Sequence, residues 1–177
     1  LYIAQPPLFR AKRGQSEVYL KDQHELDSYL VDAGLKDAVL TTFDGQQLAG
    51  TDLTIITGQA VKASRMVEVV GRQVGNRDVV EQAAIAGLFN TAVFTNDEAA
   101  TYLAKRLEAI ASTLEKGWEG RIENTAHGKA MVVQRRLRGI TERHVIDQRT
   151  INLFEAQQLD QMAGHLQTHY SKAAQFR

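Results

Sequence analysis

The chain begins with LYIAQPPLFRAKRGQSEVYLKD, residues 1–22, and this stretch sets the interpretation of the rest. Leu1 and the two residues after it form a short apolar run typical of a β-strand. Pro6 and Pro7 follow closely. Proline has no backbone N–H and a fixed φ, and it favours extended geometry in the residue before it. We therefore expect the first strand to end or bend sharply at the proline pair. Because the first residue is already strand-like and is not Met, we also expect sequence to precede it in the natural protein.

A β-hairpin is predicted immediately after the prolines. β-prone residues resume at 8–9 and again at 18–20, and the residues between them are basic and include Gly14. Glycine between two β-prone runs is typical of a tight turn. The tip of this hairpin would carry three cations, which are Arg10, Lys12 and Arg13.

The same opening stretch closely resembles the B subunit of DNA gyrase, a type II topoisomerase, just after the metal-binding carboxylates of its TOPRIM domain. The match runs without a gap from Tyr2 to Leu8 and continues through the basic turn into VYLKD. The equivalent subunit of topoisomerase IV usually has Leu where this chain has Gln5, which favours gyrase. The resemblance implies that residues 1–34 complete the TOPRIM fold. It also implies that residues 35–177 form the large insert of Gram-negative gyrase B subunits.

The resemblance also implies a function for the parent protein. The family negatively supercoils DNA: the A subunit cuts both strands, TOPRIM-bound magnesium assists, and ATP drives strand passage. DNA and the gyrase A subunit would be partners, and the location would be cytoplasmic. The family motifs E-G-D-S, D-x-D and R-Y-K-G-L-G-E do not occur in this sequence. We therefore assign no catalytic, cofactor-binding or metal-binding residue, and expect an inactive scaffold that helps to couple DNA binding to ATP use.

Composition restricts the possible functions further. The 177 residues contain 21 basic and 21 acidic side chains, so any DNA or membrane binding must come from a local patch. There is no cysteine, which excludes disulfides and thiolate chemistry. No apolar run approaches the roughly 18 residues of a membrane span.

Residues 22–49 predict a helix followed by a short hairpin. Asp22 is a good N-cap with Glu25 in capping-box position, and Gly34 is the expected end of the helix. Leu26, Tyr29 and Leu30 would form its apolar face. A strand over 38–43, an Asp44-Gly45 turn and a return strand over 46–49 follow.

A heptad pattern begins after Gly50. Its apolar positions are spaced alternately by three and four residues, which predicts a helix with Thr51 or Asp52 as N-cap. The pattern is short for a coiled coil and contains Gly58, so packing within a helical bundle is favoured over a dimer zipper. The seam consists of Leu53, Ile56, Ala60, Ala63, Val67, Val70 and Val74.

The remaining sequence predicts two helices, a three-stranded meander and a final helix, making the fold α+β. The first helix would span 77–89 with Asn76 as N-cap. The second would begin at Asn96–Glu98 and end at Gly117, with an apolar stripe formed by Leu103, Leu107, Ile110 and Leu114. The predicted strands are 118–123, 129–137 and 140–146, and the final helix is 151–174. The expected architecture is a helical bundle packed on an antiparallel sheet.

Motifs for enzymatic chemistry are absent from the sequence. It contains neither a phosphate-binding G-x-x-x-x-G-K-[ST] loop nor a G-x-S-x-G nucleophile motif. His165 and His169 are four residues apart on a predicted helix, but Leu166 stands where a zinc peptidase has its Glu. The pair is therefore interpreted as ordinary helix residues.

Basic residues of the meander are the second candidate DNA-binding patch. Strand alternation places Met131, Val133 and Leu137 on one face, and Gln134, Arg136 and Arg138 on the face toward solvent. The candidate residues here are Arg135, Arg136 and Arg138. Phosphate contact needs only charge and position, although basic strand faces also serve simply to prevent edge pairing. A purely structural spacer, a topoisomerase IV subunit and an unrelated α+β binding module remain alternatives.

Overall fold

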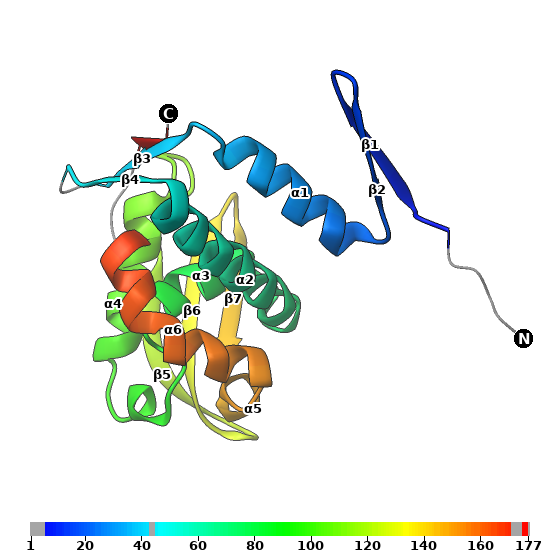
Figure 1. Cartoon of the computed structure of the whole chain (residues 1–177). Helices are drawn as coiled ribbons and strands as arrows, with labels where there is room; N and C mark the ends of the chain where they lie inside the picture. Colours follow the sequence, from blue (N-terminus) through cyan, green and yellow to red (C-terminus); the bar gives the residue numbers. More distant parts are fainter. Residues whose placement is uncertain (1–5, 43–44, 171–174, 177) are drawn as a thin grey trace, which may run out of the picture. The chain divides into compact units, whose positions relative to one another are not determined.

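The computed structural model describes residues 6–42, 45–170 and 175–176, with only the backbone given for the last two. The fold is α+β, as predicted, and contains three small antiparallel sheets within the described residues. The chain divides into two compact units. Unit 1 comprises residues 1–59 and 174–177, and unit 2 comprises residues 60–173. Figure 1 gives the element labels used below.

Unit 1 begins with the predicted hairpin. Strands β1 (Phe9–Arg13) and β2 (Ser16–Leu20) pair antiparallel, and Phe9 lies opposite Leu20. Gly14 in the two-residue turn has φ +63°, a conformation that glycine adopts without a steric penalty. The strand expected over residues 1–3 lies outside the described residues. Pro6 and Pro7 precede β1 in a segment with no regular structure.

Helix α1 (Gln23–Leu35) follows the hairpin and begins as predicted. The Asp22 side chain accepts a hydrogen bond from the Glu25 N–H at 2.9 Å, while the Glu25 carboxylate accepts from the Lys21 N–H. The end is predicted wrongly. Gly34 lies within the helix, and the left-handed residue is Asp37, with φ +66°. The predicted apolar face is not buried either, since no residue of α1 is buried and Leu30 is 57% exposed.

The second sheet of unit 1 joins segments that are distant in sequence. Strand β3 (Val39–Thr41) pairs antiparallel with β4 (Gln47–Ala49) on one side and with β8 (Gln175–Phe176) on the other. Of the predicted turn, Asp44 lies outside the described residues, whereas Gly45 has the expected positive φ of +86°. The predicted final helix extended to residue 174, so β8 was not anticipated.

Helix α2 (Gly50–Val74) contains the heptad seam. It begins at Gly50, so the predicted caps Thr51 and Asp52 lie inside the helix and that prediction is wrong. Every seam residue except Ala60 is buried within the chain, and those from Ala63 onward belong to the core of unit 2. Burial inside one chain confirms packing within a bundle.

The predicted helix over 77–89 is shorter in the structure. Asn76 caps α3 (Arg77–Ile85) by accepting from the Val79 N–H at 3.1 Å, as expected. The helix ends at Ile85 because Gly87 adopts φ +67°. The N–H groups of Gly87 and Leu88 then bond to the carbonyls of Ala84 and Ala83, which is a Schellman motif.

A short 3₁₀ helix, η1 (Thr91–Phe94), connects α3 to α4 (Glu98–Ile110). Leu103 and Leu107 of α4 are buried as predicted. The helix ends at Ile110 rather than near Gly117, so Ile110 and Leu114 are 54% and 81% exposed and do not continue the stripe. The connection to the sheet instead begins directly after residue 110.

The predicted three-stranded meander is confirmed. Strands β5 (Glu119–Thr125), β6 (Gly128–Leu137) and β7 (Ile140–Ile146) pair antiparallel in that order. The final helix is divided into α5 (Gln148–Ile151) and α6 (Phe154–Tyr170). Residues 171–174 of the predicted helix lie outside the described residues.

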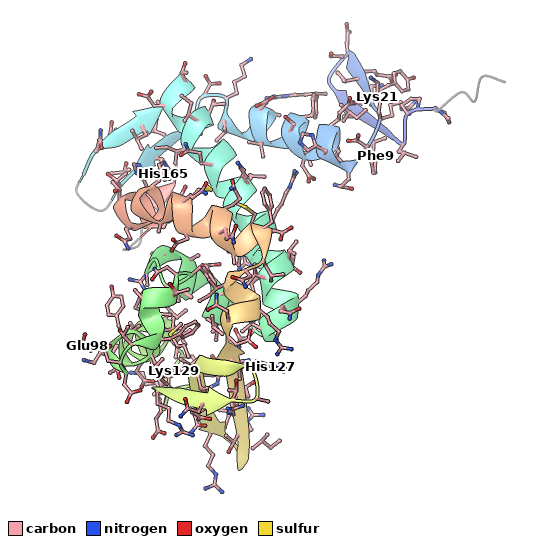
Figure 2. All side chains as sticks on the ribbon, turned by 90° about the horizontal axis from the view of Figure 1, so that it is seen from below. Phe9, Lys21, Glu98, His127, Lys129 and His165 are labelled. Atoms are coloured by element: carbon pink, nitrogen blue, oxygen red, sulfur yellow. The ribbon has the colours of Figure 1, made fainter. Side chains whose placement is uncertain are left out.

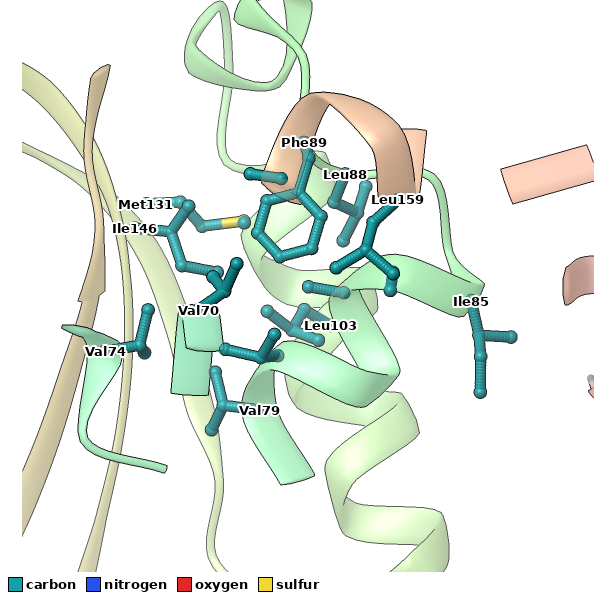
Figure 3. Close-up of a cluster of buried hydrophobic side chains, with 14 of the residues drawn as sticks. Val70, Val74, Val79, Ile85, Leu88, Phe89, Leu103, Met131, Ile146 and Leu159 are labelled. Carbon is teal, nitrogen blue, oxygen red and sulfur yellow. The ribbon is translucent and has the colours of Figure 1, made fainter. Parts of the chain in front are cut away.

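The main core of unit 2 lies between this sheet and the helices. Met131 and Ile146 project from the sheet toward Phe89 and Leu159, and all four are almost completely buried (Figure 3). Burying each large apolar side chain contributes about 1.5–3 kcal/mol. One face of the meander therefore packs against the helices of unit 2. The opposite face does not contribute to this core.

The division of the chain differs from the one implied by the resemblance. The compact units separate between Gln59 and Ala60, inside α2, rather than after residue 34. The assignment of residues 1–34 to a TOPRIM domain and 35–177 to an insert stays a prediction. In the portion of the chain that the structure describes, no helix is both long and apolar enough to span a membrane.

Candidate nucleic-acid interface

The hairpin of unit 1 sorts its three candidate cations onto two faces. Arg10 lies opposite Tyr19, and Lys12 lies opposite Glu17. Because opposed residues and alternate residues share a face, Arg10, Lys12 and the 59%-exposed Tyr19 project together. Arg13 projects from the other face. The Lys12 ammonium is 3.9 Å from the Glu17 carboxylate, with both side chains in solvent.

The meander of unit 2 likewise separates its candidate arginines. Arg136 lies opposite Thr141 and is exposed, on the sheet face away from the core. Arg135 points to the core-facing side, where only 12% of its side chain is exposed. Alternation correctly assigned Arg136 to the solvent face.

Arg135 is held by three contacts inside unit 2. Its Nε donates to the Glu142 carboxylate at 2.6 Å, and its Nη1 donates to the Glu115 carbonyl at 2.8 Å. Its guanidinium also stacks on the Trp118 ring, 4.6 Å from the ring centre. These contacts fasten the connection between α4 and β5 to the sheet, so Arg135 differs from the other candidates in being bound internally.

Arg138 is exposed, as predicted, but not because it continues the alternation of β6. It belongs to the two-residue turn between β6 and β7 rather than to the strand, and it has φ +49°, followed by Gly139 at φ +84°. Positive φ at both central residues is the type I′ geometry that matches the twist of a hairpin. The side chain is therefore displayed at the hairpin tip, near Arg136 in sequence but not on the same strand.

Two further arginines share the open sheet face with Arg136. Arg121 of β5 and Arg143 of β7 both bind the Glu123 carboxylate, at 2.6 Å and 2.8 Å. These bonds, from Arg143 first and Arg121 second, lower the pKa of Glu123 below its usual range. The Arg143–Glu123 pair crosses the central strand, where Val132 is completely buried, whereas Arg121 and Glu123 both lie on β5. About half of the Arg121 side chain and 43% of that of Arg143 remain exposed.

These two arginines could not be selected from the sequence alone. Their alternation pattern resembles that of any amphipathic strand, and their proximity depends on the register of three strands. The same face carries Arg121, Arg136 and Arg143 together with two acidic residues, Glu119 and Glu123. We define these three arginines as the open-face arginines.

A polar hollow adjoins the open face at the end marked by the β5–β6 turn. His127 and Lys129 mark this turn in Figure 2. Thr125, His127, Arg143 and Arg149 line the hollow together with the buried Asp147. Burial raises the pKa of Asp147, but bonds from the Thr150 N–H and from Arg149 outweigh it and hold the pKa below its usual range.

The histidine pair of α6 does not form part of a larger ligand cluster. The rings of His165 and His169 are 4.5 Å apart between centres. Burial, and secondarily the nearby His169, lowers the pKa of His165. Among the described residues, no three His, Cys, Asp or Glu side chains are grouped so that they could hold a metal ion.

The sequence is similar to that of several known proteins. No protein-family model matches the sequence. The DNA gyrase B subunit of Caulobacter vibrioides is 33% identical over 177 residues, which is 100% of this chain and 21% of that protein. The DNA gyrase B subunit of Rickettsia bellii is 32% identical over 163 residues, covering 92% of this chain and 20% of the relative.

A shorter match is to the type 2 topoisomerase B subunit of Aquifex aeolicus, with 40% identity over 53 residues and 27% of this chain. The gyrase matches extend over nearly all of both compact units, so they do not depend on the opening stretch alone. This chain spans about a fifth of the length of its gyrase relatives. Along its whole length, the chain is therefore similar to one part of a DNA gyrase B subunit.

Proposed function

We propose that this chain is a non-catalytic segment of a cytoplasmic DNA gyrase B subunit, within an enzyme that supercoils DNA using ATP and a gyrase A partner. The observation that carries the proposal is the similarity to gyrase B along the full 177 residues. ATP and magnesium would be bound by the parent protein outside this segment, because the sequence contains none of the family's motifs for them.

Within the segment, we propose that exposed cations contact the phosphate backbone of DNA. Arg136 and Arg138 make no ion pair with any residue that the structure describes, and both side chains are in solvent. The adjacent open-face arginines Arg121 and Arg143 are oriented by Glu123, and part of each side chain remains exposed. Phosphate contacts of this kind give affinity and position without reading sequence.

The hairpin of unit 1 offers a second contact of the same chemistry. Arg10, Lys12 and the exposed Tyr19 lie on one face, with Arg10 directly opposite Tyr19. Arg13, on the opposite face, is expected to contribute less to the same contact. Arg135 is expected to contribute through folding only, because Glu142, Glu115 and Trp118 already occupy its guanidinium.

A chimeric enzyme tests the proposed role directly. The matching segment of the Caulobacter gyrase B subunit would be replaced by this chain, and ATP-dependent supercoiling would be measured with the Caulobacter A subunit. We expect supercoiling to be retained. Changing Arg136 and Arg138 to Ala in the chimera should reduce DNA-stimulated ATP hydrolysis while leaving the DNA-independent rate unchanged.

Two results would contradict the proposal in different ways. An inactive chimera that is folded and binds the A subunit would refute its assignment as a functional gyrase segment. An active chimera whose DNA stimulation is insensitive to all four substitutions, at Arg10, Lys12, Arg136 and Arg138, would show that the segment acts purely as a spacer.

A further inference from the structure

Helix α2 contributes to both compact units. Its residues up to Gln59 belong to unit 1, and those from Ala60 onward belong to unit 2. Leu53 and Ile56 are buried, but neither belongs to the core cluster of unit 2, which α2 enters at Ala63. The buried residues of this one continuous helix thus fall into two sets, one before and one after residues 57–62.

The stretch between these two sets is only partly buried. None of the residues 57–62 is buried, and both Gly58 and Lys62 are exposed. Burial resumes at Ala63 and continues through Met66, Val67 and Val70. The side-chain carbonyl oxygen of Gln59 is buried with no hydrogen-bond partner among the described residues, and a local rearrangement would relieve this cost. Fewer buried side chains support the helix here than after Ala63, so its geometry depends more on backbone hydrogen bonds.

Gly58 has no steric reason to be glycine. A β-carbon at this position would meet nothing within 4 Å, and its φ does not lie in the left-handed region. By contrast, Gly71 of the same helix closely approaches the Arg77 backbone. A glycine in a helix interior lowers helix stability and increases backbone freedom. Gly58 therefore weakens α2 next to the boundary between the units.

We propose that residues 57–62 of α2 form a hinge, with Gly58 as its weak point, at which the helix bends between its two buried segments. The bending is a two-state exchange between a straight helix and one with a locally opened turn. The hinge is a property of the chain itself and does not depend on the proposed DNA contacts.

Spin labels on the exposed side of α2 test the hinge. Ile55 and Val69 are both exposed and about four turns apart, or about 21 Å along a straight helix. The chain contains no cysteine, so Ile55→Cys and Val69→Cys provide the two labelling sites. We expect the distance distribution measured by double electron–electron resonance to be broad or bimodal, and Gly58→Ala to narrow it to the straight-helix distance.

Gly164→Ala is the matched control. Gly164 is also an exposed glycine inside a helix, α6, and a β-carbon added to it would likewise meet nothing within 4 Å. The Gly164→Ala variant should leave the distribution of distances between the two labels on α2 unchanged. In the unlabelled chain, the amides of 60–62 should exchange hydrogen at least about tenfold faster than those of 66–70, and Gly58→Ala should slow them selectively. Any of three results would overturn the hinge: a narrow distance distribution in the chain with Gly58 unchanged, an equal narrowing of that distribution by Gly164→Ala, or uniform amide hydrogen exchange along α2.

Discussion

Gly120 of β5 lies directly against the backbone carbonyl of Ala100 in α4, so closely that a β-carbon on residue 120 would overlap the Ala100 oxygen. The helix and strand can approach this far only because residue 120 has no side chain. Gly120→Ala must therefore move one backbone away from the other, and we expect a loss of about 3 kcal/mol in unfolding free energy. Urea unfolding monitored by Trp118, the chain's single tryptophan, measures this loss. Gly164→Ala adds the same methyl group in open space and should cause no loss.

Asp97 fixes the same junction through a second contact. Its carboxylate accepts a hydrogen bond at 2.6 Å from the N–H of Ile122, on the edge of β5 that does not pair with β6. Asp97→Ala should reduce stability by about 1 kcal/mol and expose a strand edge to intermolecular pairing. Urea unfolding and light scattering at high protein concentration would detect the two effects. Asp97→Asn retains an acceptor and should be milder; equal losses for both variants would show that this bond is not responsible.

Arg135 and Arg136 are neighbours in sequence and provide an internal comparison. Arg135→Ala removes two hydrogen bonds and the stacking on Trp118 from a largely buried side chain, so we expect a loss of about 2–3 kcal/mol. Arg136→Ala, on the solvent face, should change stability by no more than about 0.5 kcal/mol. Thermal or urea unfolding gives both values. Similar losses of unfolding free energy in the two variants would contradict the finding that Arg135 and Arg136 lie on opposite faces of the sheet.

Asp147 makes stability depend on pH in a predictable direction. Its pKa is lowered in the folded chain, so its stabilising contribution is complete above the unfolded value of about 3.9 and is lost as pH falls through the lower folded value. Asp147→Asn should cost about 1–2 kcal/mol near neutral pH. The difference between wild type and variant should shrink below about pH 4. Urea unfolding at a series of pH values measures it, and a difference that is constant down to about pH 2 would contradict the assignment.

Patterns governed by neighbouring residues were predictable from the sequence. The Asp22 and Asn76 caps and the meander were found because capping and strand alternation need only local spacing. The end of α3 was misplaced because the predicted helix 77–89 includes Gly87 as an interior residue, although its left-handed conformation terminates the helix. Glycine supports both roles, and only the backbone distinguishes them.

Features that depend on distant pairing were not predictable. Strands β3 and β8 pair although most of the sequence lies between them. The Arg121–Glu123–Arg143 arrangement requires three strands in register. The apolar pattern of α1 predicted a buried face, yet burial needs a partner surface that a sequence pattern does not specify. Likewise, strand alternation was extended to Arg138, just beyond the predicted strand 129–137, whereas the structure places Arg138 in the two-residue turn.

The most direct test of the account is the salt dependence of binding between this chain and a short duplex DNA. Fluorescence anisotropy would compare wild type with Arg136→Ala/Arg138→Ala and with the control Lys62→Ala/Arg72→Ala, which removes the same charge from α2. We predict weaker binding for the first pair and a slope of log K against log salt that is shallower by about 1.8, as expected for two lost phosphate contacts. Equal slopes and affinities for wild type and the Arg136/Arg138 variant, or the same change in the control, would contradict DNA contact by this face.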